Sequence, residues 1–282
     1  MKHKLARLFS SFSPRLFFTL AYFHNRGKLP NFKKPHDLSE LWIKKILSGE
    51  INDYYYLADK YLVRDYIKRK GYSSLLTPLL GVYDSPDEID FPSLPKRFAL
   101  KANYGAGMNI ICTDKSKLDI KRNIEEMRSW LTKKSYSNSE RHYNLIEPKI
   151  ICEDFIDDGT GGFPIDYKFM CIKGKVFCIL ACNNRENGHA SYLPYSCDWE
   201  PIYNYSKDAA PLLLDKPCNL KEMISVAENL SAEMDLIRID LYSNGDKIWF
   251  GEITLTPAGC IFHRWTQKAL DDMGAFYRKY EK

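Results

Sequence analysis

The chain has 282 residues, of which 45% are hydrophobic, 27% charged and 14% aromatic. This is ordinary globular composition, and it excludes intrinsic disorder, a collagen-like repeat and a pure coiled coil. The net charge of +5 is too small to argue for nucleic-acid binding, so we expect no nucleic-acid partner.

Positive charge is concentrated at the start of the chain. Residues 1–34 contain eight Lys or Arg and no Asp or Glu, and we take residues 1–58 as a basic, aromatic N-terminal segment. No apolar run approaches the length of about 18 residues that a transmembrane helix needs. The segment could lie on the anionic inner face of a membrane, or it could be solvated and pack its aromatic side chains onto the main body. We favour the second interpretation.

Hydrophobic periodicity predicts helices over residues 59–70 and 119–134, and a third that begins at Asn219. Glu222 follows three residues after Asn219, which is typical of a capping box. Strands are predicted over residues 97–103, 109–113, 149–156, 166–172, 175–181, 237–242 and 247–254. Because helices and strands mix without strict βαβ alternation, the predicted class is α+β, with antiparallel sheets and packed helices.

The turn between the first two predicted strands is rich in glycine and follows Lys101. A lysine at this place suits a phosphate group, because small residues let backbone N–H groups approach the oxygens and the ammonium adds a mobile charge. Neither a Walker A loop nor a dinucleotide fingerprint is present. The turn by itself could equally be a plain hairpin.

A second candidate site lies on the last two predicted strands. Alternation puts Arg238 and Asp240 on one face of their strand, and Glu252 and Thr254 on one face of the next. Acidic residues among buried Ile and Leu need compensation, either from a divalent cation with nucleotide phosphate or from an ion pair with Arg238. A two-residue turn would put Glu252 on the face opposite Asp240. The metal site therefore requires a three-residue loop, 244–246, or a β-bulge.

A third group of polar residues lies between these two. Residues 153–156 end a strand before a glycine-rich link and could present backbone groups to a base edge. Asp166 and Lys168 alternate onto one face of the next strand, where they could pair with each other or reach a phosphate. Taken singly, both motifs are most simply structural.

The order of these motifs resembles the ATP-grasp superfamily and, more closely, the TupA-like ATP-grasp family. The resemblance spans roughly residues 36–275 and is carried by residues 59–66, 78–84, 100–107, 166–169, 238–242 and 251–257. It implies a nucleotide clamped between two α+β lobes of an ATP-grasp unit at 59–282, with a phosphate-flap lobe at 97–156 and a metal-binding lobe at 157–282. The implied cofactors are ATP and Mg²⁺.

The resemblance also implies roles for individual residues. Those expected to bind ATP are Lys60 and Lys101 at the phosphates, Tyr104, Gly105, Ala106 and Gly107 in the flap, Glu153, Asp154, Phe155 and Ile156 at the adenine, Asp157 or Asp158 at the ribose, and Asp166. The expected Mg²⁺ ligands are Asp240, Glu252 and Thr254. Arg238 would stabilise the acyl-phosphate transition state and Lys168 would lie near the transferring phosphate, so both are expected to be catalytic.

The implied function is an ATP-dependent carboxylate–amine ligase that forms an amide through an acyl phosphate. The family is associated with teichuronopeptide, capsule and other surface-polysaccharide pathways. The expected substrates are therefore an amino acid or another amine, and a uronic-acid carboxyl of a saccharide or polymer. We expect the protein to be cytoplasmic, either free or peripheral to the inner face of the membrane.

Two other functions remain open on the sequence. One is a nucleotide-sugar-dependent glycosyltransferase or a sugar kinase, although the absence of any Asp-x-Asp motif counts against a metal-dependent transferase. The other is a non-catalytic module that docks on a polymer or a membrane through its basic N-terminus.

Overall fold

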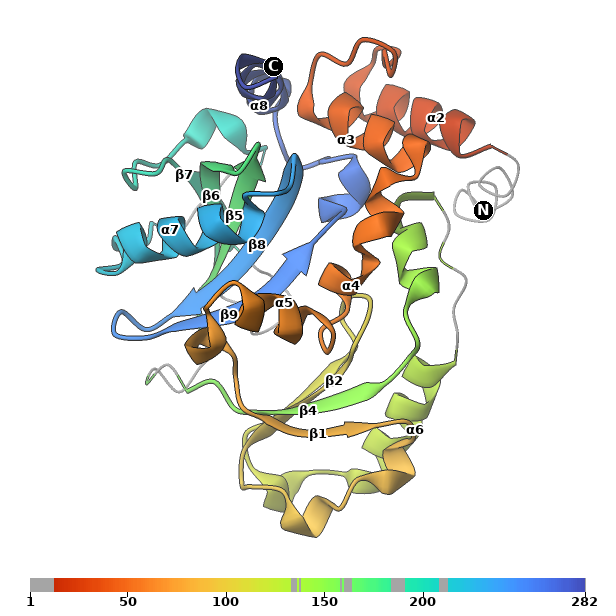
Figure 1. Ribbon diagram of the computed structural model, residues 1–282, viewed down its shortest axis with the longest axis vertical. Helices are drawn as coiled ribbons and strands as arrows, with labels where there is room; N and C mark the ends of the chain where they lie inside the picture. The colour runs from red at the N-terminus through yellow and green to blue at the C-terminus, as the bar shows by residue number, and fades with distance from the viewer. Residues whose placement is uncertain are drawn as a thin grey trace.

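The computed structural model describes residues 13–132, 136, 138–157, 159, 164–183, 191–207 and 213–281. These residues form two antiparallel sheets that lie one above the other in Figure 1, with helices packed around and between them. The predicted α+β class is confirmed. None of the described helices is long and apolar enough to cross a bilayer.

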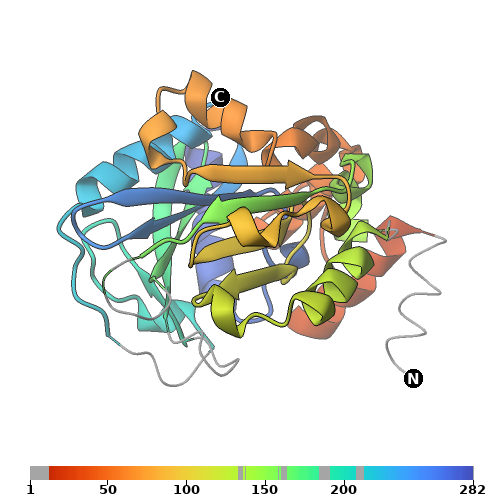
Figure 2. The same ribbon diagram turned by 90° about the horizontal axis from the view of Figure 1, so that it is seen from below.

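The smaller sheet has the order β1-β4-β2-β3. Its strands are β1 (Leu79–Tyr83), β2 (Phe98–Ala102), β3 (Asn109–Cys112) and β4 (Ile150–Asp154). Helix α6 (Ile120–Leu131) contacts β2 and buries Met127 and Trp130. Figure 2 shows this sheet from below, with α6 along its side. The helix ends at Leu131, three residues before the predicted end.

The larger sheet has the order β7-β6-β5-β8-β9. Its strands are β5 (Asp166–Ile172), β6 (Lys175–Asn183), β7 (Ser191–Tyr195), β8 (Leu236–Ser243) and β9 (Ile248–Thr254). Helix α7 (Leu220–Ser231) covers one face, where the Cys171 thiol donates to the Ala227 carbonyl. Strand alternation therefore places Asp166, Lys168 and Met170 on the opposite face.

The predicted cap of one helix and the predicted start of another are wrong, although α7 does begin directly after Asn219. The Asn219 side chain makes no capping hydrogen bond, because its Oδ1 accepts from Ser243 Oγ at 3.0 Å instead. The helix predicted from residue 59 begins four residues later, as α5 (Val63–Arg69). Asp59 Oδ1 accepts from the backbone N–H groups of Tyr61 and Leu62, and this fixes a turn before the helix.

The N-terminal helices pack against the C-terminal part of the chain. They are α2 (Pro14–Arg26), α3 (Leu38–Ser48) and α4 (Tyr55–Ala58), and α3 contacts the last helix, α8 (Gln267–Lys279). Phe18 and Tyr22 of α2 are buried, and the Tyr22 hydroxyl donates to Asp37 Oδ2 at 2.5 Å. Trp42 Nε1 donates to the Leu255 carbonyl at 2.6 Å, directly after β9. The N-terminal helices thus support the loop that follows the last strand.

Candidate functional site

A β-bulge aligns the acidic residues of the last two strands. Leu241 pairs with Phe250, but Asp240 pairs with Glu252, so Gly251 is the extra residue. Without the bulge Asp240 would face Gly251, and Glu252 would point to the opposite face. From the sequence, this alignment required either a three-residue loop or a β-bulge. The structure has the bulge, and a loop of four residues, 244–247, joins the two strands.

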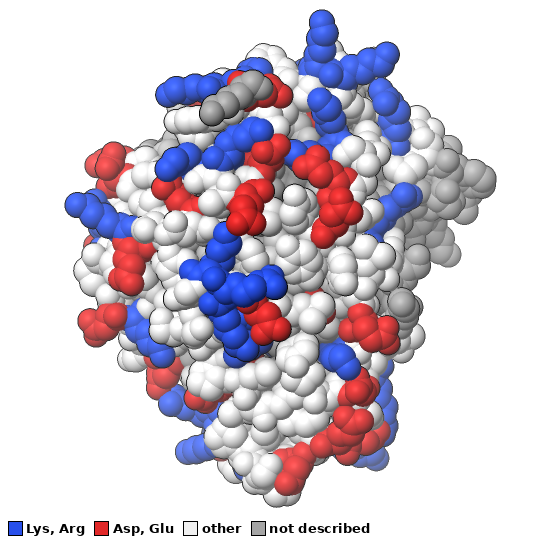
Figure 3. Space-filling model, viewed as in Figure 1, with Lys and Arg blue, Asp and Glu red and all other residues white. Residues whose placement is uncertain are grey.

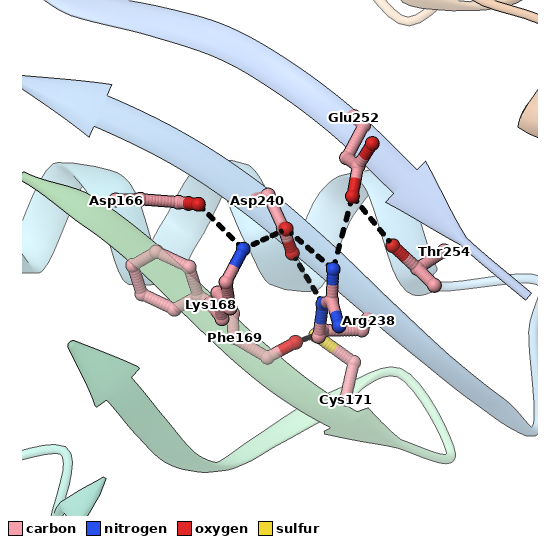
Figure 4. A network of polar contacts seen from close by, with 8 residues as sticks. All are labelled: Asp166, Lys168, Phe169, Cys171, Arg238, Asp240, Glu252 and Thr254. Carbon is pink, nitrogen blue, oxygen red and sulfur yellow. Dashed lines mark hydrogen bonds and ion pairs between the residues drawn. The ribbon is translucent and has the colours of Figure 1, made fainter. Parts of the chain in front are cut away.

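Asp240 is the centre of a buried network of ion pairs (Figure 4). Lys168 Nζ lies 2.6 Å from Asp240 Oδ2 and also contacts Asp166. Arg238 holds Asp240 by two hydrogen bonds of 2.6 and 2.7 Å, and its Nη2 reaches Glu252 Oε1 at 3.0 Å. These contacts follow from the register, because Lys168 of β5 pairs directly with Asp240 of β8.

The network keeps its charges despite burial. Burial raises the pKa of Asp240, but the positive charges of Arg238 and Lys168 outweigh it, and the pKa is lowered overall. Burial alone would lower the pKa of Arg238, yet the charge of Asp240 and its hydrogen bonds raise it. The site is therefore a fixed set of opposite charges beneath a cleft.

The cleft lies between the two sheets and has a volume of about 880 Å³ including its open mouth. Its larger-sheet wall includes Asp166, Lys168 and Glu252. Its other wall includes three further cationic residues and one acid: Lys60, Lys101, Arg64 and Glu153. This concentration of cations opposite a carboxylate is what a polyanion with a bound divalent cation requires.

Glu153 bridges two of those cations. Its Oε1 accepts from Arg64 Nη1 at 2.9 Å and its Oε2 from Lys101 Nζ at 2.7 Å. The side chain expected at the adenine thus lies in the cleft. Burial lowers the pKa of Lys101, but the charge of Glu153 and of other nearby groups outweighs burial, and the pKa is raised overall. For Lys60 burial is the larger effect, and the pKa is lowered.

The predicted flap, residues 104–107, is held at its first two residues. Gly105 and Gly107 adopt positive φ angles of 69° and 75°, which favour glycine. Lys60 Nζ donates to the Gly105 carbonyl at 2.8 Å, and Ala106 lines the cleft. Tyr104 points away from it: the side chain is buried and its hydroxyl donates to the Trp130 carbonyl at 2.5 Å. Tyr104 thus anchors the flap to α6.

A neighbouring pocket continues the cleft along the smaller sheet. Asp154, Phe155 and Ile156 line it, together with Lys101 and Tyr242. The backbone expected to receive the adenine therefore borders the lysine expected to receive the phosphates.

Of the two acids expected at the ribose, the structure describes Asp157. Asp157 pairs at 2.8 Å with Arg97, whose guanidinium lies over the Phe155 ring. Asp158 lies outside the described residues.

The oxygen ligands near Glu252 suit Mg²⁺. Glu252 is exposed for 40% of its side chain and accepts from Thr254 Oγ1 at 3.2 Å. Within the described ranges, no group of three or more Asp, Glu, His or Cys could hold a metal. Mg²⁺ characteristically takes one or two carboxylates and completes its shell with water and substrate phosphates. The structure shows the ion pair that was the alternative to a cation, because Arg238 and Lys168 bind both oxygens of Asp240 and Arg238 also reaches Glu252. Asp240, Glu252 and Thr254 stay the predicted Mg²⁺ ligands, and of these Glu252 lines the cleft.

The residues that sequence reasoning missed are Arg64 and Tyr143. Arg64 belongs to residues 59–66, one of the segments that carry the family resemblance. The sequence could therefore have pointed to Arg64 as a site residue, but it did not indicate the ion pair with Glu153. Burial raises the pKa of Tyr143, and the charges of Glu252 and Glu140 raise it further. Tyr143 belongs to a short 3₁₀ segment, Asn138–Leu145, and its ring lies 4.3 Å from that of His142.

Burial of His142 predicts a loss of stability in acid. Burial lowers its pKa from 6.5 to about 4. The His142 imidazole therefore binds a proton more readily in the unfolded chain than in the folded one. The free energy of unfolding falls as the pH drops below about 6.5. We expect the free energy of unfolding to fall by about 2 kcal/mol more in the wild type than in His142→Gln between about pH 7 and pH 5. Urea unfolding at both pH values measures this. A His24→Gln control should behave as the wild type, and an unchanged slope in His142→Gln would contradict the prediction.

Comparisons with known proteins identify the family. A family model described as TupA-like ATP-grasp matches residues 39–275. No curated protein matches the sequence. The family match covers most of the chain, including every described residue placed in the cleft above.

Several solved structures of ATP-grasp ligases match this chain at low sequence identity. The ligase PsnB in complex with its minimal precursor is 11% identical with a TM-score of 0.41, over 78% of this chain and 60% of its own. The D-alanine–D-alanine ligase of Helicobacter pylori is 14% identical with a TM-score of 0.41, over 78% and 60%. The corresponding ligase of Bacillus anthracis with ATP is 13% identical with a TM-score of 0.45, over 80% and 68%.

The chain thus spans about 60% of the length of the first two structures. ATP and Mg²⁺ are the cofactors of ATP-grasp enzymes. From the match over residues 39–275, this chain belongs to the TupA-like ATP-grasp family.

Proposed function

We propose that the protein is an ADP-forming carboxylate–amine ligase. The observation that carries the proposal is the network of Lys168, Arg238, Asp240 and Glu252 at the wall of a cleft whose other wall presents two lysines. This arrangement can bind a nucleotide polyphosphate and stabilise negative charge that develops where the phosphoryl group is transferred.

The reaction proceeds in two steps. A carboxylate oxygen attacks the γ-phosphorus of ATP, the bond to the β-phosphate oxygen breaks, and ADP leaves with those electrons. An amine nitrogen then attacks the acyl carbon and loses a proton as phosphate departs, which gives an amide. Neither step needs a protein nucleophile.

Residues of this chain bind and orient the reactants. Lys60 and Lys101 neutralise the phosphates, and Lys168 and Arg238 stabilise charge on the transferring phosphoryl group and the acyl oxygens. Asp240, Glu252 and Thr254 would hold Mg²⁺. When bound, the ion screens phosphate charge and polarises the phosphorus–oxygen bonds.

The proposed substrates are a uronic-acid carboxyl and an amino acid or another amine, in capsule or cell-surface polysaccharide synthesis. Support comes from the family's association with surface-polysaccharide pathways. The proposed location is the cytoplasm, where ATP is supplied.

Hydroxylamine trapping tests the proposed reaction. The full-length protein is incubated with Mg-ATP and D-glucuronate, with hydroxylamine or a pool of amino acids as the amine. The expected result is ADP and phosphate in equal amounts, with a hydroxamate or an amide detected by mass spectrometry. A phosphorylated sugar without hydroxamate would indicate a kinase, and ATP that neither binds nor reacts would overturn the proposal.

We infer that the outer face of α2 contacts anionic membrane. Leu16, Leu20 and Phe23 lie four and three residues apart, which puts them on one side of the helix, and they are 43%, 50% and 50% exposed. Phe18 and Tyr22 anchor the helix in the core. Basic side chains project over the upper right of the molecule, where α2 lies (Figure 3). Exposed apolar side chains among basic residues are typical of interfacial helices.

Vesicle binding tests this inference. The double variant Leu20→Ser/Phe23→Ser should bind phosphatidylserine-containing vesicles at least about tenfold more weakly than the wild type, because two apolar side chains no longer enter the interface. Added salt should weaken wild-type binding, since the basic residues act through charge.

The matched control is Leu145→Ser/Leu213→Ser, which changes two leucines elsewhere that are at least as exposed, at 54% and 60%. Flotation with phosphatidylserine and with pure phosphatidylcholine vesicles measures the difference. Equal binding by both double variants, or equal binding to neutral vesicles, would contradict the inference.

A further inference from the structure

Arg64 lines the nucleotide cleft, but its terminal nitrogens are bound to protein acceptors. Nη1 donates to Glu153 Oε1 at 2.9 Å, and Nη2 donates to the Thr77 carbonyl at 2.8 Å. Only 11% of the side chain is exposed. A phosphate in the cleft could bind these nitrogens only by breaking both hydrogen bonds, which would leave buried acceptors without a partner. The guanidinium is therefore a fixed group of the cleft wall.

Lys101 is held less firmly than Arg64. Its side chain is 25% exposed, and its Nζ has one hydrogen-bond partner in the described part of the chain, Glu153 Oε2 at 2.7 Å. A lysine carries a compact charge on a flexible stem. The ammonium can therefore leave Glu153 for a phosphate oxygen in the same cleft without movement of the sheet.

The register of the smaller sheet brings the two side chains together. Ala99 of β2 pairs with Glu153 of β4, and Lys101 lies two residues from Ala99 on the same face of its strand. Glu153 and Lys101 both line the cleft from these neighbouring strands. The carboxylate thus lies between the ammonium on one side and the Arg64 guanidinium on the other.

Helix α5, which carries Arg64, is fastened to the part of the chain that covers the larger sheet. The Tyr66 hydroxyl donates to the Leu230 carbonyl of α7 at 2.8 Å. Lys70, directly after α5, pairs at 2.7 Å with Glu233, which follows α7. Figure 1 shows α5 between the two sheets. Arg64 therefore links an element anchored on the larger sheet to a carboxylate of the smaller one, and fixes one wall of the cleft relative to the other.

Glu153 shares one negative charge between two cations. With Arg64 in place there are two cations against one carboxylate, so one positive charge remains for a phosphate. Without Arg64 the pair of Lys101 and Glu153 is neutral. Movement of the ammonium to a phosphate would then leave a buried carboxylate without a counter-charge, which is costly.

We propose that Arg64 is a positioning residue for the nucleotide phosphates. Before nucleotide binds, Glu153 holds the Lys101 ammonium in the cleft. Once Lys101 turns to a phosphate oxygen, Arg64 alone compensates the carboxylate, and it stays bound to Glu153 and to the Thr77 carbonyl throughout. This proposal rests on the proposed function, because it takes Lys101 as a phosphate ligand. It deepens that function by assigning a role to a residue that does not touch the nucleotide.

Binding of Mg-ATP to the full-length protein, measured by titration calorimetry without the other substrates, tests the proposal apart from turnover. Arg64→Gln should bind about tenfold more weakly than the wild type, because Lys101 must then leave an uncompensated carboxylate. Arg64→Lys should lose only about threefold, since its ammonium still pairs with Glu153 but cannot also reach the Thr77 carbonyl. Arg69→Gln, an exposed arginine on the same helix, should bind as the wild type.

The same substitution in a Lys101→Met background separates positioning from a general structural role. Because Arg64 acts through Lys101, Arg64→Gln should change the affinity there by less than about twofold. A direct contact of Arg64 with phosphate, or a distorted cleft, would weaken binding equally in both backgrounds. Urea unfolding shows whether each variant folds. If Arg64→Gln does not, Arg64→Lys is compared in the two backgrounds instead, and its loss should likewise disappear.

The outcomes distinguish this proposal from the proposed function. Equal losses in both backgrounds, or wild-type affinity of Arg64→Gln, would overturn the role of Arg64, while hydroxamate formed in the trapping assay would leave the ligase function standing. A wild type that does not bind Mg-ATP would overturn the proposed function and the role of Arg64 with it.

Discussion

Replacing Asp240 with asparagine is expected to lower ADP formation by at least about a hundredfold. Asp240 is almost fully buried and accepts from Lys168 and from Arg238. Asparagine keeps the shape but removes the charge that would hold Mg²⁺ and that fixes both cations. Glu252→Gln should have the same direction of effect, because it removes the second carboxylate of the proposed metal site.

The effect on catalysis must be separated from the effect on folding. Loss of one partner of a buried ion pair costs about 3–5 kcal/mol, so thermal unfolding of each variant is measured beside ADP formation. Asp246→Asn, in the exposed loop between β8 and β9, is the matched control and should react as the wild type. If Asp240→Asn stays folded and forms ADP at the wild-type rate, the proposed metal site is wrong.

Local sequence pattern predicted most of the strands. It also predicted which residues share one face of β5 and one face of β8. Period-two alternation placed Asp166 with Lys168, and Arg238 with Asp240, and the structure pairs Lys168 directly with Asp240. The strands predicted over residues 166–172 and 175–181 are confirmed, and they pair as a hairpin around Lys173-Gly174, because a short turn between two alternating strands is a local signal. The order of motifs along the chain then predicted which strands share a site.

Contacts between distant parts of the chain could not be predicted. Glu153 lies 89 residues from Arg64, and nothing in either segment specifies their ion pair. Arg26 lies more than 230 residues before the carbonyls that it binds. The loop after β9 is held by that contact. Local pattern could not predict it, because it forms only when the N-terminal helices pack against the C-terminal loop.

The Asn219 cap shows a local signal that tertiary contacts overrode. Asn219 and Glu222 have the spacing of a capping box, yet the Asn219 side chain bonds to Ser243 at the end of β8. That hydrogen bond ties the start of α7 to the sheet it covers. The apolar residues on one face of the helix predicted its position correctly. Only the predicted capping hydrogen bond is wrong, because the Asn219 side chain bonds to Ser243 instead.

The β-bulge at Gly251 gives the second large expected effect. A Cβ at residue 251 would lie 2.9 Å from the Asp240 carbonyl oxygen and 3.0 Å from Tyr242 Cε2. The first contact is with backbone, so Gly251→Ala must shift strand β9 against β8. We expect a loss of about 1–3 kcal/mol in the free energy of unfolding and, because Glu252 follows directly, a fall of about a hundredfold in ADP formation.

Gly71→Ala is the control that separates stability from site geometry. Gly71 has a φ of 84° with open space around its Cβ position, so alanine there costs about 1 kcal/mol through backbone strain alone. It lies just beyond α5, on the surface, and should leave ADP formation unchanged. Urea unfolding and ADP release are measured for both variants. If Gly251→Ala loses only stability, the strands can relax while Glu252 stays opposite Asp240. If Gly251→Ala loses far more activity than Gly71→Ala, the absence of a side chain at residue 251 is what keeps Glu252 opposite Asp240, and the proposed metal site depends on this register.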